Sequence, residues 1–317
     1  MKLTFEVWPN MPWGRLEAAG PAWNSWGDKP LIWCAERIAE SGYDGIDVIF
    51  PKILEENYTS FVEEFPARLR ELGLDFGYIG AHSTFVSPRH FDRERGIASF
   101  KQAVDAAADL GASSVCTLLG DGYYDPPLNI LLSRKEAWAQ AVGAVDEVAA
   151  HAADKGVNVS IELLQGSIVN RVPLLLRLIE EVGRDNVRAT VDTGTFYTTV
   201  KPFVGVKEAI KEIGDLIDIV HVKDEIGLPS IAQTNHTWMG GGLVDFGEVR
   251  EALEEISFSG YCSVEWEGWQ VGGNIGVGEP AGLGLADFDR VVVEAKEFLE
   301  EFGYSSARDR ESQAGKE

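Results

Sequence analysis

Short runs rich in β-branched and aromatic residues alternate along the chain with longer amphipathic stretches, and this alternation recurs about eight times. Such alternation is typical of parallel βα units, in which each strand is followed by a helix. Strand starts lie roughly 30–40 residues apart, enough for one helix and two loops. The predicted strands are Leu3–Trp8, Gly45–Phe50, Leu74–Ile79, Ser113–Leu119, Val157–Glu162, Val187–Asp192, Ile217–Val222 and Tyr261–Glu265.

The amphipathic stretches between these strands predict the helices of the same units. Several of them stop at a glycine just before the next strand, as at Gly42, Gly111, Gly156 and Gly260, which is typical of a helix C-terminus. The pattern therefore predicts an α/β fold, a single-domain (β/α)₈ TIM barrel over residues 1–304. The predicted helices are Leu31–Ser41, Tyr58–Leu72, Phe91–Leu110, Lys135–Lys155, Pro173–Val182, Val206–Leu216, Phe246–Ile256 and Leu285–Phe302.

Three connections exceed what a βα unit requires: Pro9–Pro30, Glu225–Val244 and Gly268–Gly284. All follow strands, so they lie on the catalytic face of the barrel, where long loops shape a substrate pocket. The polar tail, residues 305–317, lacks apolar periodicity and is expected to be disordered.

Charge and composition exclude several classes of protein. The net charge of −23 argues against binding nucleic acid, because such binding requires a basic surface. The simplest interpretation of the charge is that it keeps the protein in solution. No apolar run is long enough to span a membrane and no signal peptide precedes the first strand, so we expect a cytoplasmic protein. Cys34, Cys116 and Cys262 are widely spaced, which predicts reduced core residues instead of disulfides or a thiolate metal site.

Each of the last four predicted strands carries, at or near its end, a side chain that can bind a metal ion: Glu162, Asp192, His221 and Glu265. A barrel brings the ends of neighbouring strands together, so these side chains can converge. Three carboxylates and one imidazole suit Mn²⁺, which we favour, as well as Mg²⁺ or Co²⁺, and are compatible with Zn²⁺. Alternatively, each acid pairs separately with a cation or caps the next helix.

Strand alternation places further side chains around the four ligands. Residues two apart on a strand share a face. Small polar groups beneath the ligands would leave room for supporting hydrogen bonds. The expected inward-facing residues are Ser160, Thr190 and Ser263, and the expected helix-facing residues are Ile161, Val191 and Val264.

Other side chains offer weaker signals of function. His82 after the third strand is either a substrate contact or a loop-packing residue, and His236 is a candidate acid/base group. Of Lys223 and Asp224, one can point into the site while the other supports the loop; a surface ion pair is the alternative. Glu6 and Asp47 suit either sugar hydroxyls or hydrogen bonds inside the barrel.

The second half of the chain, about residues 157–266, resembles the sugar phosphate isomerase/epimerase superfamily, or xylose-isomerase-like barrel. The resemblance is carried by the motifs Ile161-Glu162, Asp192-Thr193-Gly194, His221-Val222-Lys223-Asp224, Gly240-Gly241-Gly242-Leu243-Val244-Asp245-Phe246 and Val264-Glu265, and earlier by Gly80-Ala81-His82. It implies a metal held by Glu162, Asp192, His221 and Glu265. It also implies that Glu162 and Glu265 transfer a proton on opposite sides of the reacting carbon.

The resemblance narrows the activity. The endonucleases of this family use a histidine three residues after the motif aspartate to build a three-zinc cluster. This chain has Thr195 at that position and only five histidines in all. Endonuclease activity is therefore not expected. The leading hypothesis is proton transfer beside a sugar carbonyl, giving isomerisation, epimerisation or elimination. The favoured branch resembles the α-subunit of C-glycoside deglycosidases, which acts on a 3-keto-glycoside with a small second subunit. A non-catalytic sugar-binding barrel and a metal-dependent aldolase or dehydratase are the alternatives.

Tryptophans gather on the predicted catalytic face. They predict an aromatic mouth that stacks on a sugar or an aromatic aglycone, with Trp238 and Trp269 in contact with substrate. Alternatively, they bury against another subunit of an oligomer. The tryptophans concerned are Trp8, Trp13, Trp23, Trp26, Trp238, Trp266 and Trp269.

Overall fold

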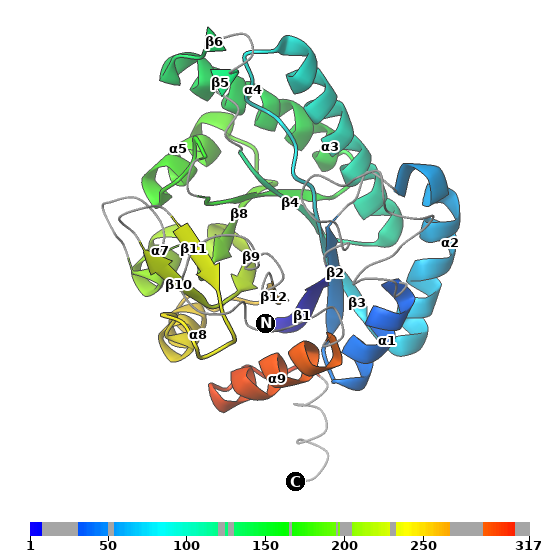
Figure 1. The fold of residues 1–317 in the computed structure, drawn as a ribbon. Coiled ribbons are helices and arrows are strands. Elements are labelled where there is room, and N and C mark those ends of the chain that lie inside the picture. The colour runs from blue at the N-terminus through cyan, green and yellow to red at the C-terminus, as the bar shows by residue number, and fades with distance from the viewer. Residues whose placement is uncertain are drawn as a thin grey trace.

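A computed structural model of the chain describes residues 1–7, 31–49, 54–119, 124–125, 130–164, 167–194, 196, 205–228, 233–266 and 288–307. Its parallel strands are β1 (Lys2–Val7), β2 (Gly45–Ile49), β3 (Asp75–Gly80), β4 (Ser114–Leu118), β7 (Asn158–Glu162), β8 (Val187–Asp192), β9 (Ile217–Val222) and β12 (Tyr261–Glu265). They close a barrel in the order β1-β12-β9-β8-β7-β4-β3-β2 (Figure 1). The prediction of a single (β/α)₈ barrel is confirmed, and three strands have the predicted bounds.

Helices surround the barrel on the outside (Figure 1). A capping box begins α4. The Glu136 backbone N–H donates to the Ser133 side chain, and the Ser133 backbone N–H donates to the Glu136 side chain. Helix α3 ends at Gly111, whose φ of 79° is a left-handed backbone conformation that suits glycine. The helices are α1 (Leu31–Glu40), α2 (Leu54–Leu72), α3 (His90–Leu110), α4 (Arg134–Ala153), α5 (Val172–Val182), α7 (Val206–Ile213), α8 (Phe246–Glu255) and α9 (Phe288–Glu301).

Two apolar regions follow from the alternation of side chains along the strands. The larger lies between the strands and the helices and contains Ile161, Val191 and Val264, as predicted. The smaller, formed by Tyr78, Cys116 and Ile219, is a separate cluster. Strand residues that do not face the helices therefore form an interior of mixed polarity.

Several connections differ from the sequence predictions. The stretch Glu225–Val244, expected to be a long loop on the catalytic face, contains an antiparallel hairpin of β10 (Glu225–Leu228) and β11 (Gln233–His236). These strands are short and carry few apolar residues, so the periodicity gave no signal for them. The connection after β4 contains a second hairpin, β5 (Tyr124–Asp125) and β6 (Ile130–Leu131). The predicted loops Pro9–Pro30 and Gly268–Gly284 lie outside the described residues.

The ends of the last helices also differ. The predicted helix over 206–216 is α-helical only to Ile213 and continues as the 3₁₀ turn η2 (Gly214–Leu216). Beyond α9, Ser306 is buried and the backbone N–H of Ala307 donates to Asp44 Oδ1 at 2.7 Å. The predicted tail therefore packs against the barrel as far as residue 307; residues 308–317 lie outside the description. Among the described helices, none combines the length and apolarity needed to cross a bilayer.

Candidate metal centre

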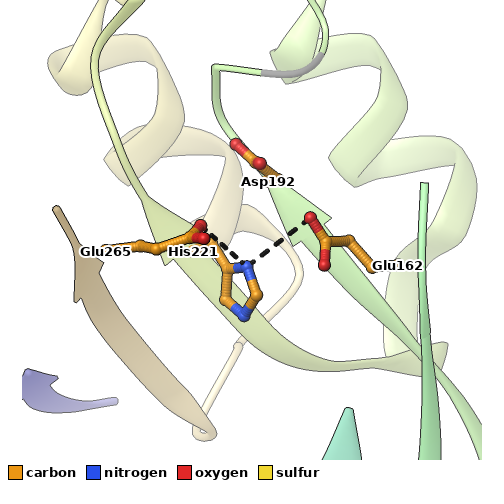
Figure 2. Close-up of side chains that lie close together, drawn as sticks. All are labelled: Glu162, Asp192, His221 and Glu265. Atoms are coloured by element: carbon orange, nitrogen blue, oxygen red, sulfur yellow. Dashed lines mark ion pairs between the residues drawn. The ribbon is translucent and has the colours of Figure 1, made fainter. Parts of the chain in front are cut away.

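Four ligand-type side chains meet where strands β7, β8, β9 and β12 end (Figure 2). Glu162, Asp192 and Glu265 are the last residues of their strands, and His221 is the penultimate residue of β9. Each offers one ligand atom, and these atoms all lie within 4.8 Å of one another. All four residues are buried. The convergence that strand order predicted is therefore present.

The imidazole in this cluster has unused bonding capacity at one of its nitrogens. His221 Nδ1 lies 3.1 Å from Glu265 Oε2 and 3.8 Å from Glu162 Oε1 (Figure 2). Nδ1 is nevertheless buried without a hydrogen-bond partner. Buried polar atoms without partners are rare and need an explanation. A divalent cation fits this donor set, because it would use the imidazole lone pair and the carboxylate oxygens together.

Lys223 brings a positive charge into the same cluster. Its Nζ lies 2.8 Å from Asp192 Oδ2, 3.0 Å from Glu265 Oε2 and 3.7 Å from Glu225 Oε1. The lysine is buried, so the alternative of a surface ion pair is wrong for it. Thr193 holds its backbone through hydrogen bonds to both Lys223 N and Lys223 O. The ammonium is thus directed toward the ligands from within the barrel mouth.

Asp224 supports the loop that follows, as expected if Lys223 points into the site. Its carboxylate accepts backbone N–H groups of Glu225, Gly240, Gly242 and Val244 at 2.8–3.2 Å. A Cβ on Gly242 would collide with Asp224 Oδ1, which explains a glycine at this position. The N–H groups of this glycine-rich turn are therefore engaged by a carboxylate of the same chain.

Burial and mutual repulsion shift the pKa values of the cluster. Burial raises the pKa of Glu162 to about 7, against the lowering effect of nearby His221. Burial favours neutral His221, but the charges of Glu265 and Glu162 raise the pKa of the imidazole well above its usual range. The metal-free site thus concentrates negative charge and retains protons. A divalent cation would neutralise the charge and displace the protons.

The layer beneath the ligands is polar, as strand alternation predicted. Ser160 Oγ lies 2.7 Å from Thr190 Oγ1, and Ser263 Oγ donates to Asp47 Oδ2 at 2.6 Å. Thr4 also donates to Asp47. Asp47 is therefore occupied by hydrogen bonds inside the barrel, and its alternative interpretation as a ligand for sugar hydroxyls is not supported.

Tyr78 on β3 is a site residue that the sequence reasoning missed. Its hydroxyl lies 2.9 Å from His221 Nε2, and the two rings stack with centroids 5.5 Å apart. The same hydroxyl donates to Glu6 Oε2. Its signal was the alternation of β3, which places Tyr78 and Gly80 on the face opposite to Ile79.

The other residues predicted to bind substrate or transfer protons lie outside the four-residue cluster or outside the described part of the chain. His82 is exposed just beyond β3, and His236 lies in β11 with its backbone opposite Glu225, while its side chain is outside the description. The Trp238 ring lies 5.0 Å from that of Trp266 and 4.4 Å from the Arg290 guanidinium. Trp269 lies outside the described residues, as do Trp8, Trp13, Trp23 and Trp26.

Comparison with known proteins places this site in context. The profile of the family described as "Xylose isomerase-like TIM barrel" matches residues 35–297. An L-ribulose 3-epimerase of Methylomonas sp. (strain DH-1) is 26% identical over 266 residues, which cover 79% of this chain and 84% of that protein. The match thus extends over most of both chains.

Solved structures show the same fold. The apo form of a 3-keto-D-glucoside 4-epimerase from E. coli superposes with a TM-score of 0.68 and 18% identity, over 95% of this chain and 99% of that one. The IolI protein with a bound zinc atom superposes with a TM-score of 0.71 and 20% identity, over 95% and 98% of the two chains.

Proposed function

The chain belongs to the xylose isomerase-like TIM barrel family, and from that premise we propose that it is a divalent-metal-dependent enzyme that moves a proton beside a sugar carbonyl. The observation that carries the proposal is the buried cluster of three carboxylates and one imidazole, whose ligand atoms lie within 4.8 Å of one another. Such a cluster is costly to bury without a cation. The isomerase/epimerase character of the relatives supports the reaction class.

We propose that Glu162, Asp192, His221 and Glu265 hold one Mn²⁺ ion. The mostly oxygen donor set favours Mn²⁺, Mg²⁺ or Co²⁺, and the zinc atom in a structural neighbour is compatible with Zn²⁺ here. When bound, the ion would supply Lewis-acid polarisation of the substrate carbonyl and orient the neighbouring hydroxyl.

Glu162 and Glu265 are the proposed acid/base pair. They project from β7 and β12, on the two sides of β8 and β9 in the barrel order, so a substrate carbon between them would face one carboxylate on each side. One would remove the proton, and the other would return a proton to the opposite face. Burial holds the pKa of Glu162 at about 7 in the metal-free protein, near the range where proton exchange is most efficient.

Other predicted residues have supporting roles in this proposal. Lys223 would neutralise developing negative charge on a substrate oxygen, because its ammonium already lies 3.0 Å from Glu265. His82 and Trp238 would contact the sugar, with Trp269 as a further stacking surface. His236 is a second candidate for proton transfer.

The substrate is proposed to be a neutral sugar or glycoside. The glycine-rich turn at Gly240–Gly242 gives backbone N–H groups to Asp224, which argues against its use for phosphate. A 3-keto-glycoside with an aromatic aglycone is the favoured substrate, cleaved by elimination with the help of a small second subunit. The fold shared with a 3-keto-D-glucoside 4-epimerase supports this branch. The L-ribulose 3-epimerase relative favours a free ketose as the second candidate.

Solvent-exchange NMR tests the reaction class directly. The protein, depleted of metal and then reloaded with Mn²⁺, is incubated in D₂O with L-ribulose, a 3-keto-glucoside or an aryl 3-keto-C-glycoside. We expect deuterium to enter the substrate at the carbon beside its carbonyl, and only in the sample with the metal-reloaded protein. Aglycone release identifies elimination, and inversion without release identifies epimerisation.

Two outcomes would contradict the proposal. Undiminished exchange after complete removal of metal would exclude metal dependence. Binding of sugars without exchange or turnover would favour a non-catalytic sugar-binding barrel, and carbon–carbon cleavage to two carbonyl fragments would favour an aldolase.

A further inference from the structure

Glu6, Tyr78 and His221 form a continuous hydrogen-bonded chain across the barrel interior. They come from β1, β3 and β9, so the contacts join strands far apart in sequence. Tyr78 donates its hydroxyl proton to Glu6 Oε2, and the hydroxyl oxygen of Tyr78 itself lies 2.9 Å from His221 Nε2. All three residues are buried, Tyr78 completely.

The chain uses the nitrogen of His221 that faces away from the other ligands. Nδ1 faces Glu265 and Glu162 at 3.1 and 3.8 Å, whereas Nε2 faces the tyrosine. A neutral imidazole carries one proton, and the hydrogen bond made by one nitrogen determines whether the other has a free lone pair. A tyrosine hydroxyl that donates to Glu6 can only accept from His221, so Nε2 must carry the proton.

We propose that Tyr78 and Glu6 are positioning residues that hold His221 with its Nδ1 lone pair directed at the metal. This inference rests on the proposed metal-dependent function. Hydrogen-bond partners of a ligand histidine fix its tautomer and ring orientation, and removing them costs roughly 10–100-fold in metal affinity. Ring stacking between Tyr78 and His221, at an interplanar angle of 23°, adds a second restraint on the imidazole.

The backbone around Tyr78 is itself constrained. Its N–H donates to Asp47 Oδ1 at 3.0 Å, and Asp47 is held in turn by Thr4 and Ser263. A Cβ at Gly77 would collide with Asp47 Oδ1, so the glycine before Tyr78 permits this contact. The tyrosine is therefore fixed from both its backbone and its hydroxyl.

Tyr78→Phe, compared with Tyr43→Phe, tests the proposal. Tyr43 is also fully buried, but its hydroxyl donates to Val292 O at 2.9 Å on the outer side of the barrel. Each full-length protein is depleted of metal and titrated with Mn²⁺ by calorimetry and with Co²⁺ by visible absorption. We expect Tyr78→Phe to weaken binding of both ions by roughly 10–100-fold and to alter the Co²⁺ ligand-field bands. Tyr43→Phe should change affinity less than about twofold and leave the bands unchanged, since it touches no ligand.

Glu6 variants provide an independent arm if Tyr78→Phe does not fold. Glu6→Leu removes the acceptor for the tyrosine, whereas Glu6→Gln retains an acceptor oxygen; we expect Glu6→Gln to lose less affinity than Glu6→Leu. Two results would overturn the positioning role alone, provided that the wild-type protein binds metal. One is a metal affinity of Tyr78→Phe that equals that of Tyr43→Phe. The other is a metal affinity of Glu6→Leu that equals that of the wild type. A wild-type protein that takes up neither ion would overturn the proposed function as well as this inference.

Discussion

The two halves of the barrel contribute to the site in different ways. Strands β7, β8, β9 and β12 carry the four ligand-type residues at or next to their carboxyl ends. In the described part of β1–β4, the interior polar residues Glu6, Asp47 and Tyr78 instead hydrogen-bond to other protein groups. The second half thus presents donor atoms, and the first half orients them.

This division shows why buried acids in one barrel differ in chemistry. Asp47 has hydrogen bonds from Thr4, Ser263 and the Tyr78 backbone, although burial raises its pKa to about 6. Glu265 Oε2, in contrast, lies 3.1 Å from a ligand-type imidazole and 3.0 Å from the Lys223 ammonium. A carboxylate that accepts hydrogen bonds from hydroxyl and backbone groups supports structure, whereas one that faces ionisable nitrogen atoms is available to a metal cation.

The largest effect should come from the ligand-bearing half. Glu162→Gln and Glu265→Gln each remove a charged ligand and a proposed proton-transfer group, so we expect turnover to fall by about 10²–10⁴-fold. Glu251→Gln is the matched control, because this α8 acid pairs with Lys207 on the surface. Steady-state kinetics and metal analysis of all three variants measure the difference. Near-wild-type turnover of either site variant would remove that glutamate from the proposed mechanism.

Metal affinity should depend on pH because the ligand carboxylate holds a proton. The pKa of Glu162, raised by burial to about 7, means that metal must displace a proton below that pH. Affinity should rise at least about tenfold per pH unit between pH 5 and 7 for the proton on Glu162, and more steeply if His221 also releases a proton. Calorimetry in buffers of different ionisation enthalpy counts the released protons. Affinity that does not change between pH 5 and 7 would contradict this assignment.

The raised pKa of Glu162 also makes the stability of the metal-free protein depend on pH. Because the folded-state pKa of Glu162 lies above its usual 4.5, protonation stabilises the metal-free fold most below pH 4.5. This contribution is lost as pH rises through about 7, where a bound cation should restore stability. Thermal unfolding with and without Mn²⁺ at pH 5 and 8 measures the difference, and a larger metal effect at pH 5 would contradict it.

Lys223 allows substrate binding to be separated from metal binding. Lys223→Met removes an ammonium 2.8 Å from Asp192 and 3.0 Å from Glu265, so metal affinity should be retained or increased. KM for the sugar should rise by roughly tenfold, the loss typical of a charged hydrogen bond. Lys223→Arg, which keeps the charge, is the control. A loss of metal affinity in Lys223→Met would show instead that the lysine organises the ligands.

The smallest effect on activity should come from Asp47, the residue of the supporting half whose hydrogen bonds end on hydroxyl and backbone groups. Asp47→Asn weakens hydrogen bonds from Thr4, Ser263 and the Tyr78 backbone, and should lower the free energy of unfolding by about 1–3 kcal/mol. Turnover of the folded fraction should remain within about threefold, because Asp47 contacts none of the four ligands through these bonds. Denaturant unfolding and kinetics distinguish the two effects. Loss of turnover comparable to that of Glu162→Gln would end the division between the halves.

Local pattern was sufficient to predict the barrel and the four ligand-type residues at its rim. Periodicity predicted β8, β9 and β12 with their observed bounds, because strands that alternate and end in turn residues carry a local signal. Since the carboxyl ends of parallel barrel strands meet at one rim, Glu162, Asp192, His221 and Glu265 could be placed together without coordinates. The β10–β11 hairpin was missed because its short strands lack that signal.

The partners of these residues required the tertiary structure. Alternation predicts only the face on which a side chain lies, and Tyr78 could have met any residue across the barrel. Its contact with Glu6 and His221 depends on strand tilt and stagger, which are set when the barrel closes. Asp224 likewise accepts N–H groups from residues up to 20 positions away, a result of how the chain returns after the β10–β11 hairpin. The amino-acid sequence determined which donor atoms reach the rim, and barrel closure decided which groups orient them, because closure sets distances between strands that are not neighbours.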